Sequence, residues 1–482
     1  MRSNFFTIGI ILVVGLNMSS RSEAQTSYPM LMSLDATAIQ VGQTSELTVH
    51  SRYSMFGATQ VIVSGEGVTC EIATEMKLDK DGKEPSLTEL IVRFTAAADA
   101  LTGVRDFRIN TPNGVSTLGQ LVVTSLPVQS EDPKQDNNSP EKAHEVTLPA
   151  TICGTIEKNE DVDCFKFHIE EPGDWTFHMQ AMRLEDRIHD LQSHVDPIIT
   201  LRSSTGATLA VCDNHFYADP FLSYHFDQPG DYQIEIRDVR YQGNKFWSYA
   251  LEVDRNPFVS VAYPLAVVRG RENEIQLLGE SVPENTISRL TVSPESPLGE
   301  ANQPFPINGK QSNPVKVLVT DTEPALESTE SHSDLETAQQ VTFPGLVAGR
   351  ILQEGELDLY RFEAKKDSAY RFEILSRRLQ SSLDSNLRIL DSTGKALLET
   401  DDMTVFRMSY SDSLVDKWVA PTDGVFYLEV RDLHLREETY SYLIKATEAK
   451  PHFELYVDTD KTLVSPSSPG VLLCTSRQKK RI

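Results

Sequence analysis

Residues 154–169 read GTIEKNEDVDCFKFHI, and residues 349–364 read GRILQEGELDLYRFEA. Both stretches begin with glycine, continue through an acidic turn and end in alternating aromatic residues. The two glycines are 349 − 154 = 195 residues apart, and Asp163 and Asp358 have the same separation. A long fixed period indicates a duplicated folding unit. Because hydrophobic residues alternate with polar ones after each turn, each stretch is expected to form a β-strand with one buried face.

The match extends over about 115 residues, a length that can bury the core of a sandwich. The motifs VTLP (146–149) and VTFP (341–344) precede the two stretches, and PGDYQIEIRD (229–238) and DGVFYLEVRD (423–432) follow them. The remaining chain is also rich in strand patterns. Residues 103–123, GVRDFRINTPNGVSTLGQLVV, contain an Asn-Gly pair between two apolar runs, which predicts a hairpin.

These patterns predict an all-β protein built as a tandem array of β-sandwiches. Polar, apolar-poor segments at 125–143 and 319–338 are typical of linkers. The expected division is a signal peptide at 1–24, an immunoglobulin-like sandwich at 28–127, the first repeat at 137–254, a small immunoglobulin-like domain at 255–322, the second repeat at 332–447, and a tail at 448–482 that has the appearance of a truncated domain.

The N-terminus predicts export. Arg2 precedes the apolar run FFTIGIILVVGL, and Ser22 and Ala24 occupy the positions that signal peptidase requires before Gln25. No later segment reaches the ~18 apolar residues of a membrane span. The net charge is −25 and the pI about 4.9, which argue against nucleic acid or anionic lipid as a partner. We therefore expect a protein that is secreted or otherwise extracytoplasmic.

The five cysteines stand at positions 70, 153, 164, 212 and 474. Cys153 and Cys164 flank the acidic turn of the first repeat, so they could form a disulfide in an oxidising compartment. The second repeat has Ala348 and Leu359 at these positions, so the fold should not depend on such a bridge.

Catalytic motifs are missing from the sequence. H-E-x-x-H, G-x-S-x-G and G-x-x-x-x-G-K-[ST] do not occur, so we expect no enzyme activity. His189, His194, Cys212 and His215 could imitate a zinc site, although loop histidines are the favoured interpretation. Each of the three tryptophans has a tyrosine at the matching place of the other repeat, which favours core packing over a sugar-binding platform.

Carboxylates recur at the ends of turns and strands in both repeats. Calcium takes about six to eight oxygen ligands from flexible loops, so converging acidic loops would suit it. The alternative is turn chemistry, because aspartate accepts hydrogen bonds from nearby backbone amides. The calcium candidates are Asp161, Asp163, Asp196, Asp213, Glu356, Asp358, Asp384, Asp401 and Asp402.

The ordered set of motifs resembles the bacterial and archaeal pre-peptidase C-terminal domain. The shared run is G-x-I, an acidic turn, D-x-aromatic-x-F, D-x-x-L-x-L/I with a later glycine, an Asp-Asp or Asp-Asn pair, G-x-Y-x-I-x-V and S-Y-x-L, at 137–254 and 332–447. The resemblance implies two jelly-roll-like sandwiches without catalytic activity. Members of this family trail secreted peptidases and aid secretion or substrate attachment, and some collagen-binding relatives bind calcium. The overall plan resembles exported multidomain proteins of planctomycetes and related bacteria.

These observations predict an exported, non-catalytic adhesion or binding protein whose modules, on flexible linkers, gain avidity for a protein or polysaccharide surface. The alternative is an accessory to, or fragment of, a secreted peptidase or other hydrolase.

Overall fold

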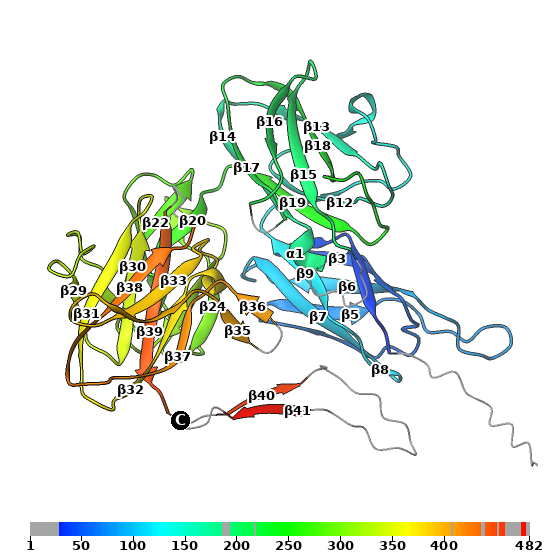
Figure 1. Cartoon of the computed structure of the whole chain (residues 1–482). Helices are drawn as coiled ribbons and strands as arrows, with labels where there is room; N and C mark the ends of the chain where they lie inside the picture. Colours follow the sequence, from blue (N-terminus) through cyan, green and yellow to red (C-terminus); the bar gives the residue numbers. More distant parts are fainter. Residues whose placement is uncertain are drawn as a thin grey trace, which may run out of the picture.

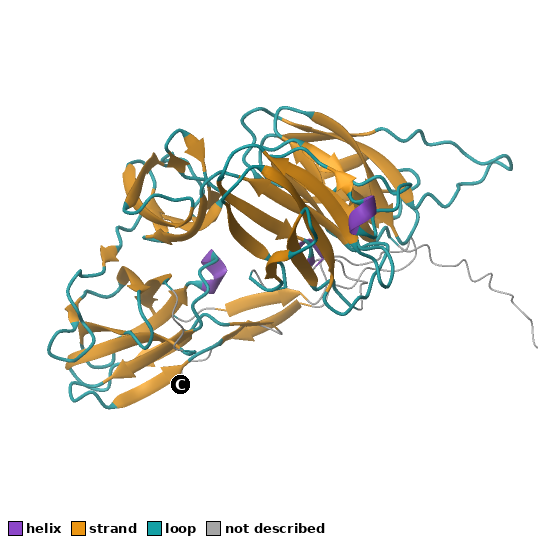
Figure 2. Ribbon diagram, turned by 90° about the horizontal axis from the view of Figure 1, so that it is seen from above, coloured by secondary structure: helices purple, strands orange, loops and turns teal. Residues whose placement is uncertain are grey.

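The computed structural model describes residues 28–185, 193–215, 218–405, 408–434, 439–450, 453–457 and 474–478. The predicted signal peptide and most of the tail lie outside these residues. The fold is all-β, as predicted, with strands joined by loops and short helical turns (Figure 2). Four β-sandwiches follow one another along the chain (Figure 1).

The first small sandwich packs the sheet β1-β3-β6-β5 against the sheet β2-β9-β7-β4. The predicted Asn-Gly hairpin is confirmed, since β7 and β8 pair across Thr111 and Gly114. The strands are β1 (Leu31–Asp35), β2 (Ala38–Gln40), β3 (Thr44–Ser51), β4 (Gln60–Val63), β5 (Val68–Ile72), β6 (Glu89–Ala96), β7 (Gly103–Thr111), β8 (Gly114–Val115) and β9 (Gly119–Thr124).

The first repeat sandwich has the sheets β10-β12-β19-β14-β17 and β11-β13-β18-β15-β16. Its elements are β10 (Val128–Ser130), η1 (Pro140–Lys142), β11 (His144–Glu145), β12 (Ala150–Thr155), β13 (Asp163–Ile169), β14 (Gly173–Gln180), α1 (Met182–Glu185), β15 (Pro197–Ser203), β16 (Thr208–Cys212), β17 (Phe221–Phe226), β18 (Gly230–Asp238) and β19 (Ser248–Asp254).

The second small sandwich has the sheets β20-β22-β23 and β21-β27-β24, with the short pair β25-β26 beside them. Its strands are β20 (Phe258–Tyr263), β21 (Ala266–Val268), β22 (Glu272–Glu280), β23 (Thr286–Thr291), β24 (Gly299–Gln303), β25 (Pro306–Ile307), β26 (Lys310–Gln311) and β27 (Val315–Thr320).

The second repeat sandwich has the sheets β28-β30-β39-β32-β37 and β29-β31-β38-β33-β34. Its elements are β28 (Ala325–Leu326), β29 (Gln339–Gln340), β30 (Gly345–Ile351), β31 (Leu357–Ala364), β32 (Ala369–Leu375), η2 (Arg377–Leu379), β33 (Ser385–Leu390), β34 (Ala396–Thr400), β35 (Met403–Val405), β36 (Met408–Tyr410), β37 (Leu414–Val419), β38 (Gly424–Asp432) and β39 (Tyr440–Glu448); in the tail, β40 (Phe453–Val457) pairs with β41 (Cys474–Gln478).

The two repeat sandwiches have the same strand order in both sheets. In each, the first strand of one sheet comes from the segment predicted to be a linker: β10 pairs in parallel with β12, and β28 with β30. The segments predicted to be flexible linkers are therefore built into the sandwiches. Where these segments are buried, their backbone N–H and C=O groups must be hydrogen-bonded, and pairing in a sheet supplies these bonds. Amino-acid composition alone does not show this pairing.

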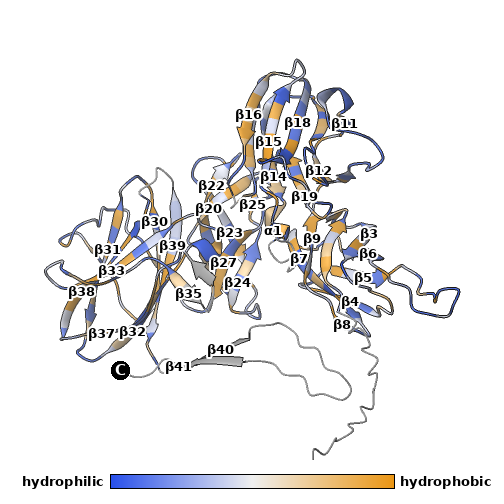
Figure 3. Ribbon diagram, turned by 45° about the vertical axis from the view of Figure 1, so that its right-hand side comes forward, coloured by the Kyte–Doolittle hydropathy of each residue, from blue (hydrophilic) through white to orange (hydrophobic). Residues whose placement is uncertain are grey.

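Alternation along the strands builds the cores (Figure 3). In β13, Phe165, Phe167 and Ile169 point between the sheets, while Lys166 and His168 face outward. All three tryptophans are buried in the two repeat cores, as predicted from their tyrosine counterparts: Trp175, Trp247 and Trp418. None of them is available as an exposed sugar platform.

The predicted disulfide is not formed, and Cys153 and Cys164 are free thiols. The two residues lie in opposite sheets of the sandwich. Their neighbours Ile152 and Phe165 point into the shared core. Since side chains alternate along a strand, each cysteine points away from that core, on opposite sides of the sandwich. Burial raises the pKa of both thiols to about 12, so neither is reactive at neutral pH.

Each small sandwich packs against the repeat sandwich that follows it. Ala38 and Val122 contact Cys153 and Ala250 in the first pair. In the second pair, Val267 belongs to one apolar cluster with Ala348 and Leu443, the counterparts of Cys153 and Ala250. Each small sandwich also contains an equivalent parallel strand pair: β2 with β9 in the first, and β21 with β27 in the second. The repeated unit is therefore a pair of domains rather than one sandwich.

Candidate functional site

Each repeat sandwich buries an aspartate at the start of the strand after the acidic turn. Asp163 is 2 % exposed and Asp358 is 1 % exposed. Each aspartate is an even number of residues from the core-facing residues of its strand. Its carboxylate therefore points to the same side as they do, between the two sheets. Tyr249 in β19 donates its hydroxyl to Oδ2 of Asp163 at 2.8 Å, and Tyr442 in β39 donates in the same way to Oδ2 of Asp358.

The glycine that opens each repeated stretch makes room for this contact. Gly154 is paired with Tyr249 across the sheet, and Gly349 with Tyr442. A Cβ atom at Gly154 would overlap the Tyr249 hydroxyl and lie 2.9 Å from Oε2 of Glu131. The repeated glycine is therefore required by close packing around the buried carboxylate.

In the first repeat, the preceding segment adds two more oxygen-bearing side chains. Glu131 accepts a hydrogen bond from the Thr155 amide at Oε1, 2.9 Å away. The Asn137 side-chain amide donates to Oδ1 of Asp163 at 3.2 Å, and the Asn137 backbone carbonyl accepts a hydrogen bond from the Cys164 amide. We call Glu131, Asn137 and Asp163 the first junction cluster, because these residues join the segment 125–143 to the first repeat sandwich.

In the second repeat, the equivalent group is Glu327, His332 and Asp358, which we call the second junction cluster. The His332 carbonyl accepts from the Leu359 amide, as the Asn137 carbonyl does from Cys164. Nε2 of His332 lies 3.4 Å from Oδ1 of Asp358 and 3.7 Å from Oε1 of Glu327. Arg350 replaces Thr155, and its Nε lies 3.3 Å from Oε2 of Glu327.

Burial controls the ionisation of both clusters. Burial, reinforced by the charge of Asp163, raises the pKa of Glu131, and burial likewise raises the pKa of Asp163. In the second cluster, burial raises the pKa of Glu327 to about 7 despite the opposing charge of Arg350, and raises the pKa of Asp358 well above its usual range. Paired carboxylates in a dry volume need a proton or a cation.

Of the predicted calcium residues, Asp161 and Glu356 are turn residues. The Asp161 carboxylate accepts the Glu157 amide at 2.7 Å. The Glu356 carboxylate accepts hydrogen bonds from the backbone amides of Leu352 and Gln353, at 2.6 and 3.0 Å. Both carboxylates therefore stabilise turns by accepting hydrogen bonds from nearby backbone amides, which is the alternative to calcium binding. Asp161 is also buried directly beside Asp163 and adds to its raised pKa.

The other predicted calcium residues form a separate loop group in each repeat. The amides of Asp196 and Asp384 donate to Asp238 and Asp432, at 3.0 and 3.2 Å. Burial raises the pKa of Asp196. The charge of Arg240 opposes this rise, and the charge of Asp213 adds to it. The Asp213 side chain accepts a hydrogen bond from the Asn214 amide. In the second repeat, the Asp401 side chain accepts one from the Asp402 amide. Calcium at these residues stays a prediction.

Two of the side chains considered for a zinc site, Cys212 and His215, lie beside Phe221. His189 lies outside the described residues. The Cys212 thiol donates to the Phe221 carbonyl at 3.1 Å, and the His215 ring packs 5.2 Å from the Phe221 ring. Within the described part of the chain, the grouping of three facing metal-ligating side chains is the second junction cluster.

Sequence analysis missed four residues of the junction clusters, because their partners lie in distant strands. One signal was present: each linker carries a glutamate at a similar distance before the buried aspartate, 163 − 131 = 32 and 358 − 327 = 31 residues. The missed residues are Glu131, Asn137, Glu327 and His332.

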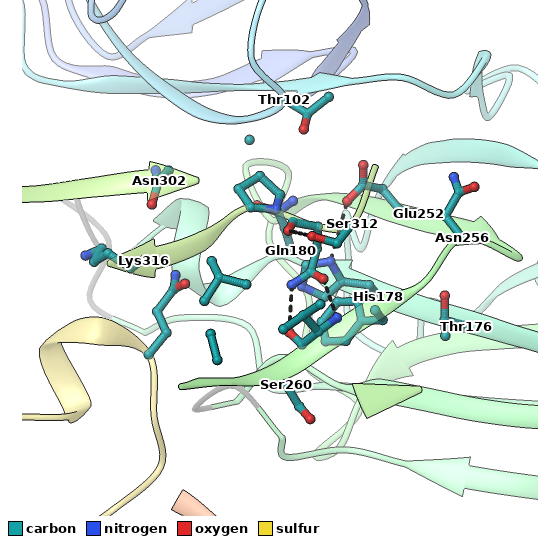
Figure 4. A pocket seen from close by; sticks show the side chains of 18 of the residues that line it. Thr102, Thr176, His178, Gln180, Glu252, Asn256, Ser260, Asn302, Ser312 and Lys316 are labelled. Carbon is teal, nitrogen blue, oxygen red and sulfur yellow. Dashed lines mark hydrogen bonds and ion pairs between the residues drawn. The ribbon is translucent and has the colours of Figure 1, made fainter. Parts of the chain in front are cut away.

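A cavity of about 570 Å³, lined by both polar and apolar side chains, lies where all four sandwiches meet (Figure 4). The first small sandwich contributes Thr102 and the first repeat contributes His178. The second small sandwich contributes Ser260 and Asn302, and the second repeat contributes Ser381. The cavity therefore exists only when the four sandwiches keep this arrangement.

Several charged groups on the cavity wall contact one another. Nδ1 of His178 lies 3.5 Å from the Glu252 carboxylate, and Nε2 of His178 lies 3.0 Å from Arg183. Arg183 in turn pairs with buried Asp219 at 2.6 Å. Burial would raise the pKa of Glu252, but the hydrogen bond and charge of His178 lower it below its usual value.

The sequence matches no known protein family, and no curated protein matches it. Among solved structures, the pre-peptidase C-terminal domain of a collagenase from Bacillus anthracis shares 11 % identity over 23 % of this chain and 94 % of that chain, with a TM-score of 0.19. The secreted serine protease VesC from Vibrio cholerae shares 10 % identity over 45 % of this chain and 48 % of that chain, with a TM-score of 0.17.

A Bacteroides ovatus protein, SGBP-B of a mixed-linkage glucan utilization locus, solved with a heptasaccharide, shares 9 % identity over 85 % of this chain and 72 % of that chain, with a TM-score of 0.14. At these identities and TM-scores the neighbours assign neither a family nor a function to this chain. Among the described residues, no helix is long and apolar enough to cross a membrane.

Proposed function

We propose that this chain is an exported, non-catalytic binding protein of the cell surface or extracellular space. The observation that carries the proposal is the cavity lined by all four sandwiches. Its volume of about 570 Å³ falls within the range of small-ligand sites, roughly 300–1,000 Å³. Export rests on the signal-peptide pattern of residues 1–24.

The wall chemistry favours a segment of a neutral polysaccharide as the ligand. Glu252 on the wall faces His178 at 3.5 Å and Lys316 lies 3.7 Å from Glu300, so these charges already have partners within the chain. Side-chain amides and hydroxyls such as those of Asn302 and Ser260 donate and accept hydrogen bonds. Sugar hydroxyls need both functions.

The test is binding of the mature chain, residues 25–482, to a panel of soluble polysaccharides by isothermal titration calorimetry. Ser260→Trp places a large ring in the cavity from an exposed position, and should weaken binding at least about tenfold, or about 1.4 kcal/mol. Thr205→Trp, in an exposed turn of the first repeat, is the matched control and should bind normally.

Equal affinity of both variants would contradict the cavity as the site. Binding of proteins but of no polysaccharide would contradict the ligand class and favour the alternative, an accessory role beside a secreted hydrolase.

We further propose calcium as a cofactor of the first junction cluster. The donors fit a hard cation, because Glu131 and Asp163 offer carboxylate oxygens and Asn137 offers an amide oxygen once its side-chain carbonyl turns inward. Calcium at about a hundred times its dissociation constant should raise the unfolding free energy by about 2.7 kcal/mol. Thermal unfolding with calcium and with excess chelator measures this difference, and Asp163→Asn should abolish it.

A further inference from the structure

His332 has the tautomer and the surroundings of a metal-binding histidine. Its Nδ1 lies 3.2 Å from the Glu330 carbonyl, so Nδ1–H donates to that oxygen. The Nε2 atom then presents its lone pair to the cluster interior. His332 is 5 % exposed, and Nε2 is a buried atom without a hydrogen-bond partner. A buried nitrogen of this kind calls for a ligand.

The spacing of the three facing atoms suits a tetrahedral cation. Nε2 of His332 is 3.4 Å from Oδ1 of Asp358 and 3.7 Å from Oε1 of Glu327, and the three ligand atoms lie within 4.8 Å of one another. Ligands at ~2.05 Å from a tetrahedral zinc ion are ~3.3 Å apart. Small side-chain shifts would therefore place all three on one ion.

The remaining atom of each side chain is already held by an outer partner. Tyr442 donates to Oδ2 of Asp358, and Arg350 contacts Oε2 of Glu327 at 3.3 Å. The Glu330 carbonyl holds Nδ1 of His332. Outer partners of this type orient the ligands of metal sites and leave the inner atoms facing the ion.

Charge also favours a divalent ion. Three carboxylates influence the cluster, those of Glu327, Asp358 and Glu356, and Arg350 supplies one positive charge. With all three carboxylates ionised and His332 neutral, the group would carry a net charge of −2, which one divalent cation would balance. A buried imbalance of this size is costly without a counter-charge.

We propose that Glu327, His332 and Asp358 bind a divalent transition metal of the zinc class, with a water molecule as the fourth ligand. The metal would fasten the segment after β28 to the second repeat sandwich. The first repeat differs at the deciding position, since Asn137 stands where His332 stands, and its oxygen donors suit calcium instead. The proposal does not depend on the cavity or its ligand.

The experiment uses the mature chain, freed of metal by chelator and titrated with Co²⁺ as a spectroscopic substitute for Zn²⁺. We expect one Co²⁺ per chain with the visible absorption of a tetrahedral site, displaced by Zn²⁺. His332→Asn installs the residue of the first repeat, so the variant should fold and should lose this band. Tyr442→Phe keeps the ligands and should weaken Zn²⁺ binding by about 10–100-fold.

Two results would overturn the proposal. One is an unchanged band in His332→Asn, which would place the metal elsewhere, for example on a free cysteine. The other is no tetrahedral Co²⁺ in the unmodified chain, which would leave the three side chains without a shared metal ion. Circular dichroism and chelator-treated unfolding of His332→Asn confirm that the comparison is made on a folded protein.

Discussion

Gly154 faces the Tyr249 hydroxyl and the Glu131 carboxylate, so its replacement tests the local packing. In Gly154→Ala, the new methyl group would overlap Tyr249. Overpacking of a filled core costs about 1–3 kcal/mol, and urea unfolding should show a loss of this size. Gly206→Ala is the comparison: its methyl group meets open space, and the backbone conformation alone should cost about 1 kcal/mol. A smaller loss at Gly154 than at Gly206 would contradict the packing role.

Glu185 is a buried carboxyl whose ionisation should make stability depend on pH. It is 2 % exposed, and burial raises its pKa to about 7, against opposing interactions with His194 and the Val195 amide. Because the folded state holds the proton more tightly than the unfolded state, stability should fall as pH rises from about 4.5 to 7. The loss is at most about 3 kcal/mol.

Glu185→Gln should remove this dependence, and the second repeat already has Gln380 at the corresponding place after Arg378. The variant should therefore gain stability over the unmodified protein at pH 8 and lose that advantage at pH 4.5. Urea unfolding at the two pH values measures the difference. An equal difference at both values would contradict a titrating Glu185.

The turn after β32 is anchored by a buried ion pair that both repeats share. Asp412 accepts the amides of Ser376 and Arg377, and pairs with Arg378 at 2.7 Å. Removing one partner of a buried pair costs about 3–5 kcal/mol, so Asp412→Ala should destabilise the second repeat by that amount in urea unfolding. Glu363→Ala, which removes an exposed partner of Arg361, should cost less than about 1 kcal/mol. Similar losses would contradict the anchoring role.

Local pattern was enough to predict the strands, because alternation and turn residues act over a few neighbours. The β13 and β31 strands and the Asn113–Gly114 hairpin are of this kind. The junction clusters could not be predicted in this way. Glu131 and His332 lie in polar segments without strand pattern, and their role appears only when β10 and β28 join a sheet. The disulfide failed for the same reason: nearness in sequence did not show that Cys153 and Cys164 lie in opposite sheets.

Contacts between the two domain pairs fix how the pairs are arranged in the whole molecule. The Phe221 ring of the first repeat stacks on Phe258 of the second small sandwich, with centroids 4.1 Å apart. A Cβ on Gly103 would lie 3.5 Å from Pro314, so the two small sandwiches also meet. These contacts hold the cavity walls together and make the cavity a property of the assembled chain.

Small-angle X-ray scattering of residues 25–482 measures whether the four sandwiches keep a fixed arrangement around the cavity. A fixed arrangement predicts a scattering curve that matches the structure, with a radius of gyration unchanged between low and high salt. The reference for a single compact body of this length is about 22 Å, and four adjoining sandwiches should exceed it only moderately. A Kratky plot that rises to a plateau, with a much larger radius, would show independent modules and contradict the cavity as a binding site.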